Sequence, residues 1–81
     1  MAQYKYREHL IHSSTAAFDT RHAPGTIASN GGIYRCAVCG EEILVCKGQR
    51  LPAETHHPHE PKLGKIEWQL LVFAEQRSDP R

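Results

Sequence analysis

Two cysteines in the middle of the chain have the spacing of a metal-binding turn. Cys36 and Cys39 are separated by two residues and followed directly by Gly40, in the run RCAVCG. Two thiolates at this spacing can face one ion while the chain reverses direction, and glycine tolerates the positive φ that such a turn often needs. The pair predicts one half of a metal site.

The other half is predicted in the run HHPH, after the intervening residues 40–55. There, His56 and His59 repeat the two-residue spacing with imidazoles in place of thiols. Zinc accepts sulfur and nitrogen together in a closed tetrahedron, and two thiolates balance the charge of the ion. We therefore predict a zinc (Zn2+) site with these ligands: Cys36, Cys39, His56 and His59.

Other donors compete for this site. His57 is an alternative to either histidine. Cys46 ends an alternating apolar run, so we expect it in the core as a small hydrophobic residue, and the alternative is that it replaces a histidine in a Cys3His site. His9, His12 and His22 have no partner at metal spacing and are expected on the surface.

The ion is expected to be structural, and the protein is not expected to be an enzyme. A catalytic zinc keeps an open position for water beside a carboxylate base, for which Glu54 and Glu60 are candidates, but four or more donors crowd this site. A redox role for the cysteine pair would need a helix at the first cysteine, which the surrounding residues do not favour. Prolines around the histidines also argue against a helical zinc finger.

Length and composition explain why a metal would be needed. The chain has 81 residues, 40% of them hydrophobic, which permits one domain with a thin core. Three cysteines are an odd number, and the N-terminal run MAQYKYREHL has no apolar stretch of the kind found in signal peptides. We expect a soluble protein of the reducing cytoplasm with no membrane segment.

Three strands are predicted around the site. The runs GIYRC and EEILVCK flank the cysteine turn, and KIEWQLLVFAE is the strongest strand candidate. In that last run Ile66, Trp68, Leu70 and Val72 share one face at period two. Because Leu71 and Phe73 make the opposite face apolar too, we expect this strand to be central in its sheet or partly covered.

The expected fold is a small β fold, a zinc-ribbon-like antiparallel sheet with an extended, loop-rich N-terminal segment. Residues 1–32 are polar and rich in turn residues and are expected to pack on the ribbon, although the run YKYREHLI suggests one short strand. Residues 33–75 form the ribbon domain, and residues 76–81 form a flexible tail.

These motifs resemble those of small bacterial zinc-ribbon-like proteins. The shared pattern is P-G, then G-x-Y-x-C-x-x-C-G, then K-G-x-x-x-P, a second ligand pair and a strand that contains Trp, and it spans roughly residues 24–74. Many such proteins end the motif with a second C-x-x-C, where this chain has histidines. The resemblance implies a metal site and a ribbon fold, and the group mostly lacks an assigned activity.

Two functions remain open for a ribbon with a structural zinc ion. The first is a protein-interaction or accessory module that docks an unknown protein partner, or a second copy, through an exposed strand edge or the second face of LLVFA. The second is nucleic-acid binding, although the net charge of +1 gives it little support. The side chains available for that role are Tyr34, Arg35, Lys47, Arg50, Lys62 and Lys65.

Overall fold

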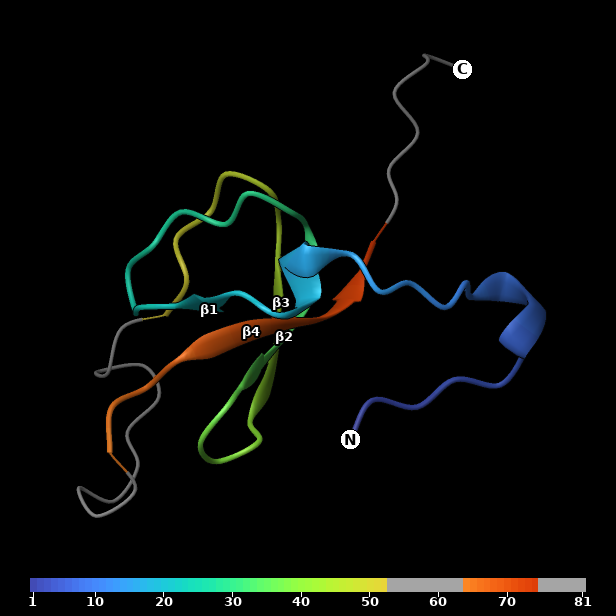
Figure 1. The fold of residues 1–81 in the computed structure, drawn as a ribbon, viewed down its shortest axis with the longest axis horizontal. Helices are drawn as coiled ribbons and strands as arrows, with labels where there is room; N and C mark the ends of the chain where they lie inside the picture. The colour runs from blue at the N-terminus through green and yellow to red at the C-terminus, as the bar shows by residue number, and fades with distance from the viewer. Residues whose placement is uncertain (53–63, 75–81) are drawn as a thin grey trace.

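The computed structural model describes residues 1–52 and 64–74, which form a small all-β fold. Its sheet is antiparallel, with the strand order β1-β4-β2-β3 (Figure 1). The elements are η1 (Arg7–His9), η2 (Ala16–Phe18), β1 (Arg21–His22), β2 (Gly32–Cys36), β3 (Glu42–Val45) and β4 (Trp68–Phe73). The prediction of a small antiparallel β fold with a loop-rich N-terminal segment is confirmed.

Strand β4 is central, as its two apolar faces predicted. It pairs with β1 on one side and β2 on the other, and Trp68 and Leu70 are buried. The predicted position of Val72 is wrong. A bulge pairs Leu70 with Tyr34 but Val72 with Ile33, and because neighbouring strand residues face opposite sides, Val72 leaves the face of Trp68 and Leu70.

Gly32 allows β2 and β4 to approach each other at this bulge. Its φ is +151°, and a Cβ atom there would overlap the carbonyl oxygen of Val72 and lie 3.0 Å from the amide nitrogen of Ala74. Both obstacles are backbone atoms, which cannot rotate away as the end of a side chain can. Only glycine fits this position without moving one of the two strands.

Gly32→Ala is therefore expected to lower the free energy of unfolding by about 3 kcal/mol or more. The matched control is Gly48→Ala: Gly48 also has a positive φ, +90°, but nothing lies within 4 Å of its added Cβ atom. That variant should lose only the backbone contribution, about 1 kcal/mol. Urea unfolding measures both, and equal losses would contradict the steric explanation.

The core lies between the sheet and a layer of two loops. Residues 23–31 and 46–52 run side by side, joined by backbone hydrogen bonds such as that from the Ala28 N–H to the Gln49 carbonyl, 2.8 Å (Figure 1). Ala28 and Leu51 from these loops pack against the buried face of the strands. The buried hydrophobic residues are Ala28, Tyr34, Cys36, Val45, Leu51, Ile66, Trp68 and Leu70.

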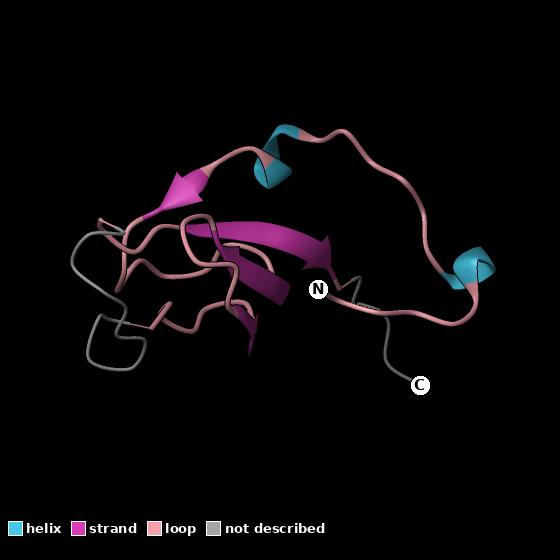
Figure 2. Cartoon of the chain, turned by 90° about the horizontal axis from the view of Figure 1, so that it is seen from below, coloured by secondary structure: helices cyan, strands magenta, loops and turns pink. Residues whose placement is uncertain are grey.

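The prediction of a strand near the N-terminus is wrong. Residues 7–9 form the 3-10 helix η1, and every residue from 1 to 16 is exposed. Figure 2 shows this segment running away from the sheet beyond η2 and turning back. A strand is stable only when its backbone N–H and C=O groups pair with a neighbouring strand, and no strand of the described sheet pairs with residues 1–16.

In the part of the chain described, no helix is long and apolar enough to cross a membrane.

Candidate metal site

The two cysteines of the predicted site lie in a tight turn after β2. Cys36 is the last residue of β2, and its carbonyl accepts a hydrogen bond from the Gly40 N–H, 2.9 Å, across the turn. The Cys36 N–H donates to the carbonyl of Glu41, 2.8 Å, so the turn is closed on both sides. Gly40 has a φ of +85°. This confirms the prediction that the turn needs a residue with a positive φ after Cys39, which glycine tolerates.

The turn brings the two thiols within reach of each other. Their side chains are hydrogen-bonded, and neither is in a disulfide. Cys36 is fully buried against the core, whereas Cys39 is exposed. The pKa of the Cys39 thiol is raised, and partial desolvation is the largest cause. The neighbouring Cys36 and Glu41 charges raise this pKa further, whereas a hydrogen bond from the backbone of Glu41 lowers it. The Cys39 thiol therefore carries its proton at neutral pH.

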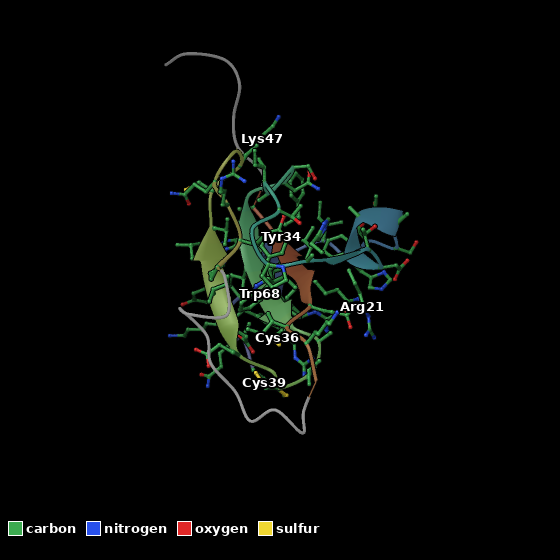
Figure 3. All side chains as sticks on the ribbon, turned by 90° about the vertical axis from the view of Figure 1, so that its left-hand side faces the viewer. Arg21, Tyr34, Cys36, Cys39, Lys47 and Trp68 are labelled. Carbon is green, nitrogen blue, oxygen red and sulfur yellow. The ribbon has the colours of Figure 1, made fainter. Side chains whose placement is uncertain are left out.

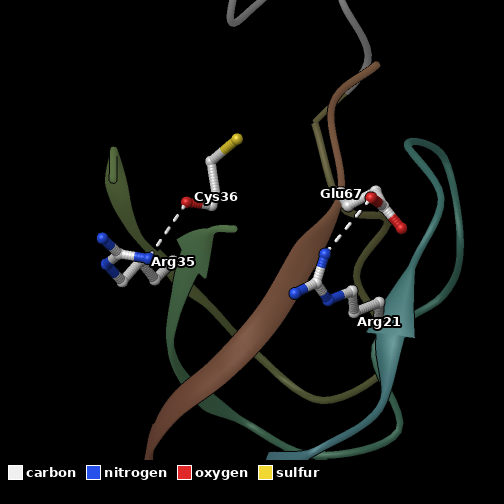
Figure 4. A network of polar contacts seen from close by, with 4 residues as sticks. All are labelled: Arg21, Arg35, Cys36 and Glu67. Atoms are coloured by element: carbon white, nitrogen blue, oxygen red, sulfur yellow. Dashed lines mark hydrogen bonds and ion pairs between the residues drawn. The ribbon is translucent and has the colours of Figure 1, made fainter. Parts of the chain in front are cut away.

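Arg35 places a positive charge beside this turn. Its Nη1 atom lies 3.5 Å from the carbonyl oxygen of Cys36 (Figure 4), and its guanidinium lies over Gly40. Figure 4 also shows the ion pair of Arg21 and Glu67, 3.5 Å, on the other side of β4. The guanidinium thus lies against the backbone of the cysteine turn.

The predicted histidine ligands, His56 and His59, lie outside the described residues, as does their competitor His57. Within residues 1–52 and 64–74, no three His, Cys, Asp or Glu side chains are grouped closely enough to hold a metal ion. The described structure thus contains two of the predicted donors, and they lie together.

A contact that the sequence did not reveal anchors the chain beside the cysteines. The indole Nε1 of Trp68 donates to the carbonyl oxygen of Pro52, 3.0 Å, and Trp68 is the cross-strand neighbour of Cys36. Just before it, the carbonyl of Glu67 accepts the N–H of Ala37 in the cysteine turn, 2.8 Å. Both flanks of residues 53–63 therefore approach the end of the sheet that carries the thiols.

The prediction that Cys46 lies in the core is wrong, and so is its alternative as a ligand beside Cys36. Cys46 is exposed and follows β3, in a turn where its N–H donates to Oε1 of Gln49, 2.8 Å. Val45 pairs with Gly32, at the opposite end of β2 from Cys36. The length of β2, about 13 Å at about 3.3 Å per residue, separates the two ends. Figure 3 shows this separation between Cys39 and Lys47.

His22 is only partly a surface residue, contrary to the prediction. It is half-buried on β1, and its ring meets the ring of Tyr34 edge-on at 6.2 Å between centroids. No local signal could have revealed this contact, because it depends on the pairing of β1 with β4. His9 and His12 are exposed, as predicted.

Of the side chains named for nucleic-acid binding, Lys62 lies outside the described residues, and Tyr34, Arg35 and Lys47 do not share one face. Tyr34 is fully buried, and its hydroxyl donates to the carbonyl of Asn30, 2.7 Å, so its ring cannot stack on a base. Burial raises the pKa of Tyr34, and the hydrogen bond to Asn30 opposes this rise. Arg35 lies at the cysteine end, whereas Lys47 lies at the other end (Figure 3). Arg50 donates to the carbonyl of Gly25, 3.0 Å.

Comparison with known proteins shows a relative among the curated proteins. Neither a family model nor a solved structure matches the chain. Protein L of Escherichia coli is 35% identical over 69 residues, which cover 85% of this chain and 78% of that protein. A match of this identity over most of both chains shows common descent, and the chain belongs to the same family as Protein L of Escherichia coli.

Proposed function

We propose that this protein is a small zinc-binding module of the cytoplasm whose metal ion is structural and whose exposed sheet surface docks protein. The observation that carries the proposal is the meeting of the Cys36 and Cys39 thiols in one glycine-closed turn. Two thiols at this spacing are the usual half of a structural zinc site, and reduced thiols are typical of the cytoplasm.

The positions of Pro52 and Trp68 support His56 and His59 as the remaining ligands. Pro52 is held at Trp68, the neighbour of Cys36, by the indole hydrogen bond of 3.0 Å. From residue 52 to residue 56 an extended chain reaches at most about 14 Å, which is enough to return a side chain to the thiols. The zinc ion would then link β2 to the chain that precedes β4.

A structural ion suits this chain better than a catalytic one. Cys36 is fully buried in the small core, so a cation bound to its sulfur would be joined directly to the packing of Trp68 and Leu70. Four protein donors would complete the tetrahedron and leave no position for a water nucleophile. The ion would supply cross-linking that a thin core lacks.

Protein docking has more support than nucleic-acid binding. The described surface exposes large apolar side chains on the sheet, among them Leu44, Leu71 and Phe73. By contrast, single-strand binding uses an aromatic platform and a continuous positive face, whereas the ring of Tyr34 is buried and the described cations Arg35 and Lys47 lie at opposite ends of β2. Salt-sensitive retention on heparin would contradict this assignment.

Native mass spectrometry tests the proposal most directly. Protein purified without chelator should carry one zinc ion per chain under native conditions and none after denaturation in acid, since the ligands must be deprotonated to bind. A native mass equal to that of the bare polypeptide, unchanged after incubation with excess zinc, would end the zinc proposal.

Zinc binding at pH 7 is also expected to release the proton of Cys39. Because the pKa of this thiol is raised above its usual value of 9.0, the thiol is protonated before binding, and affinity should rise with pH across the neutral range. Calorimetric titration of zinc in two buffers of different ionisation enthalpy measures the protons released. Identical heats in both buffers would show that no thiol loses a proton.

A further inference from the structure

The backbone of the cysteine turn holds two thiols at the separation that a disulfide bond requires. Residues 37–39 are in the turn, which is closed by the hydrogen bond from the Gly40 N–H to the Cys36 carbonyl, 2.9 Å. Residues three apart in a tight turn lie within about 7 Å of each other between Cα atoms, and disulfides span about 4.4 to 6.8 Å. The side chains of Cys36 and Cys39 are already hydrogen-bonded to each other. The two sulfurs are therefore within reach of one S–S bond.

The two thiols differ in their access to solvent, and this sets the order in which they react. Cys39 is exposed, so a small disulfide in solution can reach its sulfur. Cys36 has no exposed surface, and the Cys39 thiol lies at hydrogen-bond distance from it. Thiols that are open to solvent react first with a dissolved oxidant, and a neighbouring thiol then resolves the product. Cys39 is thus placed to attack, and Cys36 to resolve.

The third cysteine cannot form an internal disulfide with this pair in the folded chain. Cys46 is exposed, but it follows β3, at the opposite end of β2 from Cys36. The length of β2, about 13 Å at about 3.3 Å per residue, is roughly twice the largest Cα separation that a disulfide spans. Cys46 is therefore a reference thiol within the same molecule, open to the same oxidant but without a partner for an internal bond.

We propose that Cys36 and Cys39 are a reversible thiol–disulfide pair, which a low-molecular-weight disulfide such as oxidised glutathione converts into an internal disulfide. The Cys39 sulfur bonds to one sulfur of oxidised glutathione, whose S–S bond breaks, and one reduced glutathione leaves with the Cys39 proton. The Cys36 sulfur then bonds to the Cys39 sulfur and displaces a second reduced glutathione, which takes the Cys36 proton. Two electrons and two protons pass from the protein to glutathione.

The expected consequence is release of zinc, and this part of the inference rests on the proposed function. Thiolates bind zinc, and a disulfide has no thiolate to offer. In the zinc-loaded protein the two sulfurs carry no protons, so the two reduced glutathione molecules take their protons from water. The pair would act as a switch and not as an oxidoreductase, because catalytic C-x-x-C pairs begin a helix, whereas Cys36 ends a strand.

A count of free thiols tests the pair in the full chain. Reduced protein of measured zinc content is incubated with excess oxidised glutathione, alkylated, and mapped by mass spectrometry. We expect Cys36 joined to Cys39, with glutathione on Cys46. Because the Cys36 thiol is held beside Cys39, the internal disulfide should exceed the mixed disulfide on Cys39 at least about tenfold at millimolar glutathione. Both thiols of the pair still free when Cys46 is fully modified, or glutathione retained on Cys39, would overturn the proposal.

Cys36→Ser and Cys46→Ser are matched variants, since each replaces one cysteine by serine. Cys36→Ser removes the resolving thiol, so glutathione on Cys39 should increase at least about tenfold over the wild type. This result does not require a folded variant, because Cys39 is accessible in the folded chain and in an unfolded one. Cys46→Ser should form the internal disulfide as the wild type does. Equal amounts of glutathione on Cys39 in the two variants would overturn the proposal.

Zinc measured in the same incubation distinguishes this inference from the proposed function. One zinc ion should be released for each internal disulfide formed, and reduction in the presence of excess zinc should restore the loaded protein. Zinc retained on a chain whose two thiols stay reduced would refute the redox pair and leave the structural metal site in place. An internal disulfide in a protein that binds no zinc when reduced would support the redox pair and refute the metal site.

Discussion

Cys39→Ser is expected to leave the protein without zinc and without a cooperative unfolding transition at 25 °C. The side chain is exposed, so serine creates no cavity in the core, and the loss would come from the metal. Structural zinc sites contribute on the order of 10 kcal/mol to folding, comparable with the whole stability of an ordinary small domain. Native mass spectrometry and urea unfolding followed by circular dichroism measure the two effects.

The control for this substitution is Cys46→Ser, the same chemical change at a second exposed cysteine. Cys46 lies beyond the far end of β2 from Cys36, so it should keep one zinc per chain and wild-type stability within about 0.5 kcal/mol. Cys36→Ser is less informative, because it would also place a hydroxyl in the buried core. A Cys39→Ser protein that retained zinc, or a Cys46→Ser protein that lost it, would contradict the assigned ligands.

Trp68→Ala is expected to cause the largest loss of stability among core substitutions. Trp68 is fully buried on the central strand, and truncation of a large aromatic side chain typically costs about 3 to 5 kcal/mol. The variant also removes the donor that holds the Pro52 carbonyl at 3.0 Å. We therefore expect it to weaken zinc binding as well, because the chain that leads to the predicted histidines loses its anchor beside Cys36.

Trp68→Phe separates packing from anchoring. Phenylalanine keeps most of the buried ring but has no N–H to donate to Pro52, so the expected loss is about 1 to 3 kcal/mol, smaller than that of alanine. If anchoring matters for the metal, zinc affinity should fall in both variants. Wild-type zinc affinity in Trp68→Phe would show that the hydrogen bond does not position the ligands, and equal unfolding free energies for the two variants would exclude packing as the main cause.

Much of the sheet could be predicted from local pattern. The alternation of Ile66, Trp68 and Leu70 predicted a buried face for β4, and all three are buried. The glycine after C-x-x-C predicted a turn with positive φ, which Gly40 has. These features depend on near neighbours in the chain, because side-chain alternation and turn conformation are set by the backbone of a few residues.

The sequence by itself determined that two thiols share one turn, that strands flank it and that the strand with Trp68 has a buried face. The tertiary structure alone decided that Cys46 lies at the other end from Cys39, that Tyr34 is buried and that Val72 changes face at a bulge. The physical reason is that alternation fixes the relative facing of residues within one strand. Contacts between residues far apart in the chain fix which strands pair and in which register, and therefore which residues share an end of the sheet.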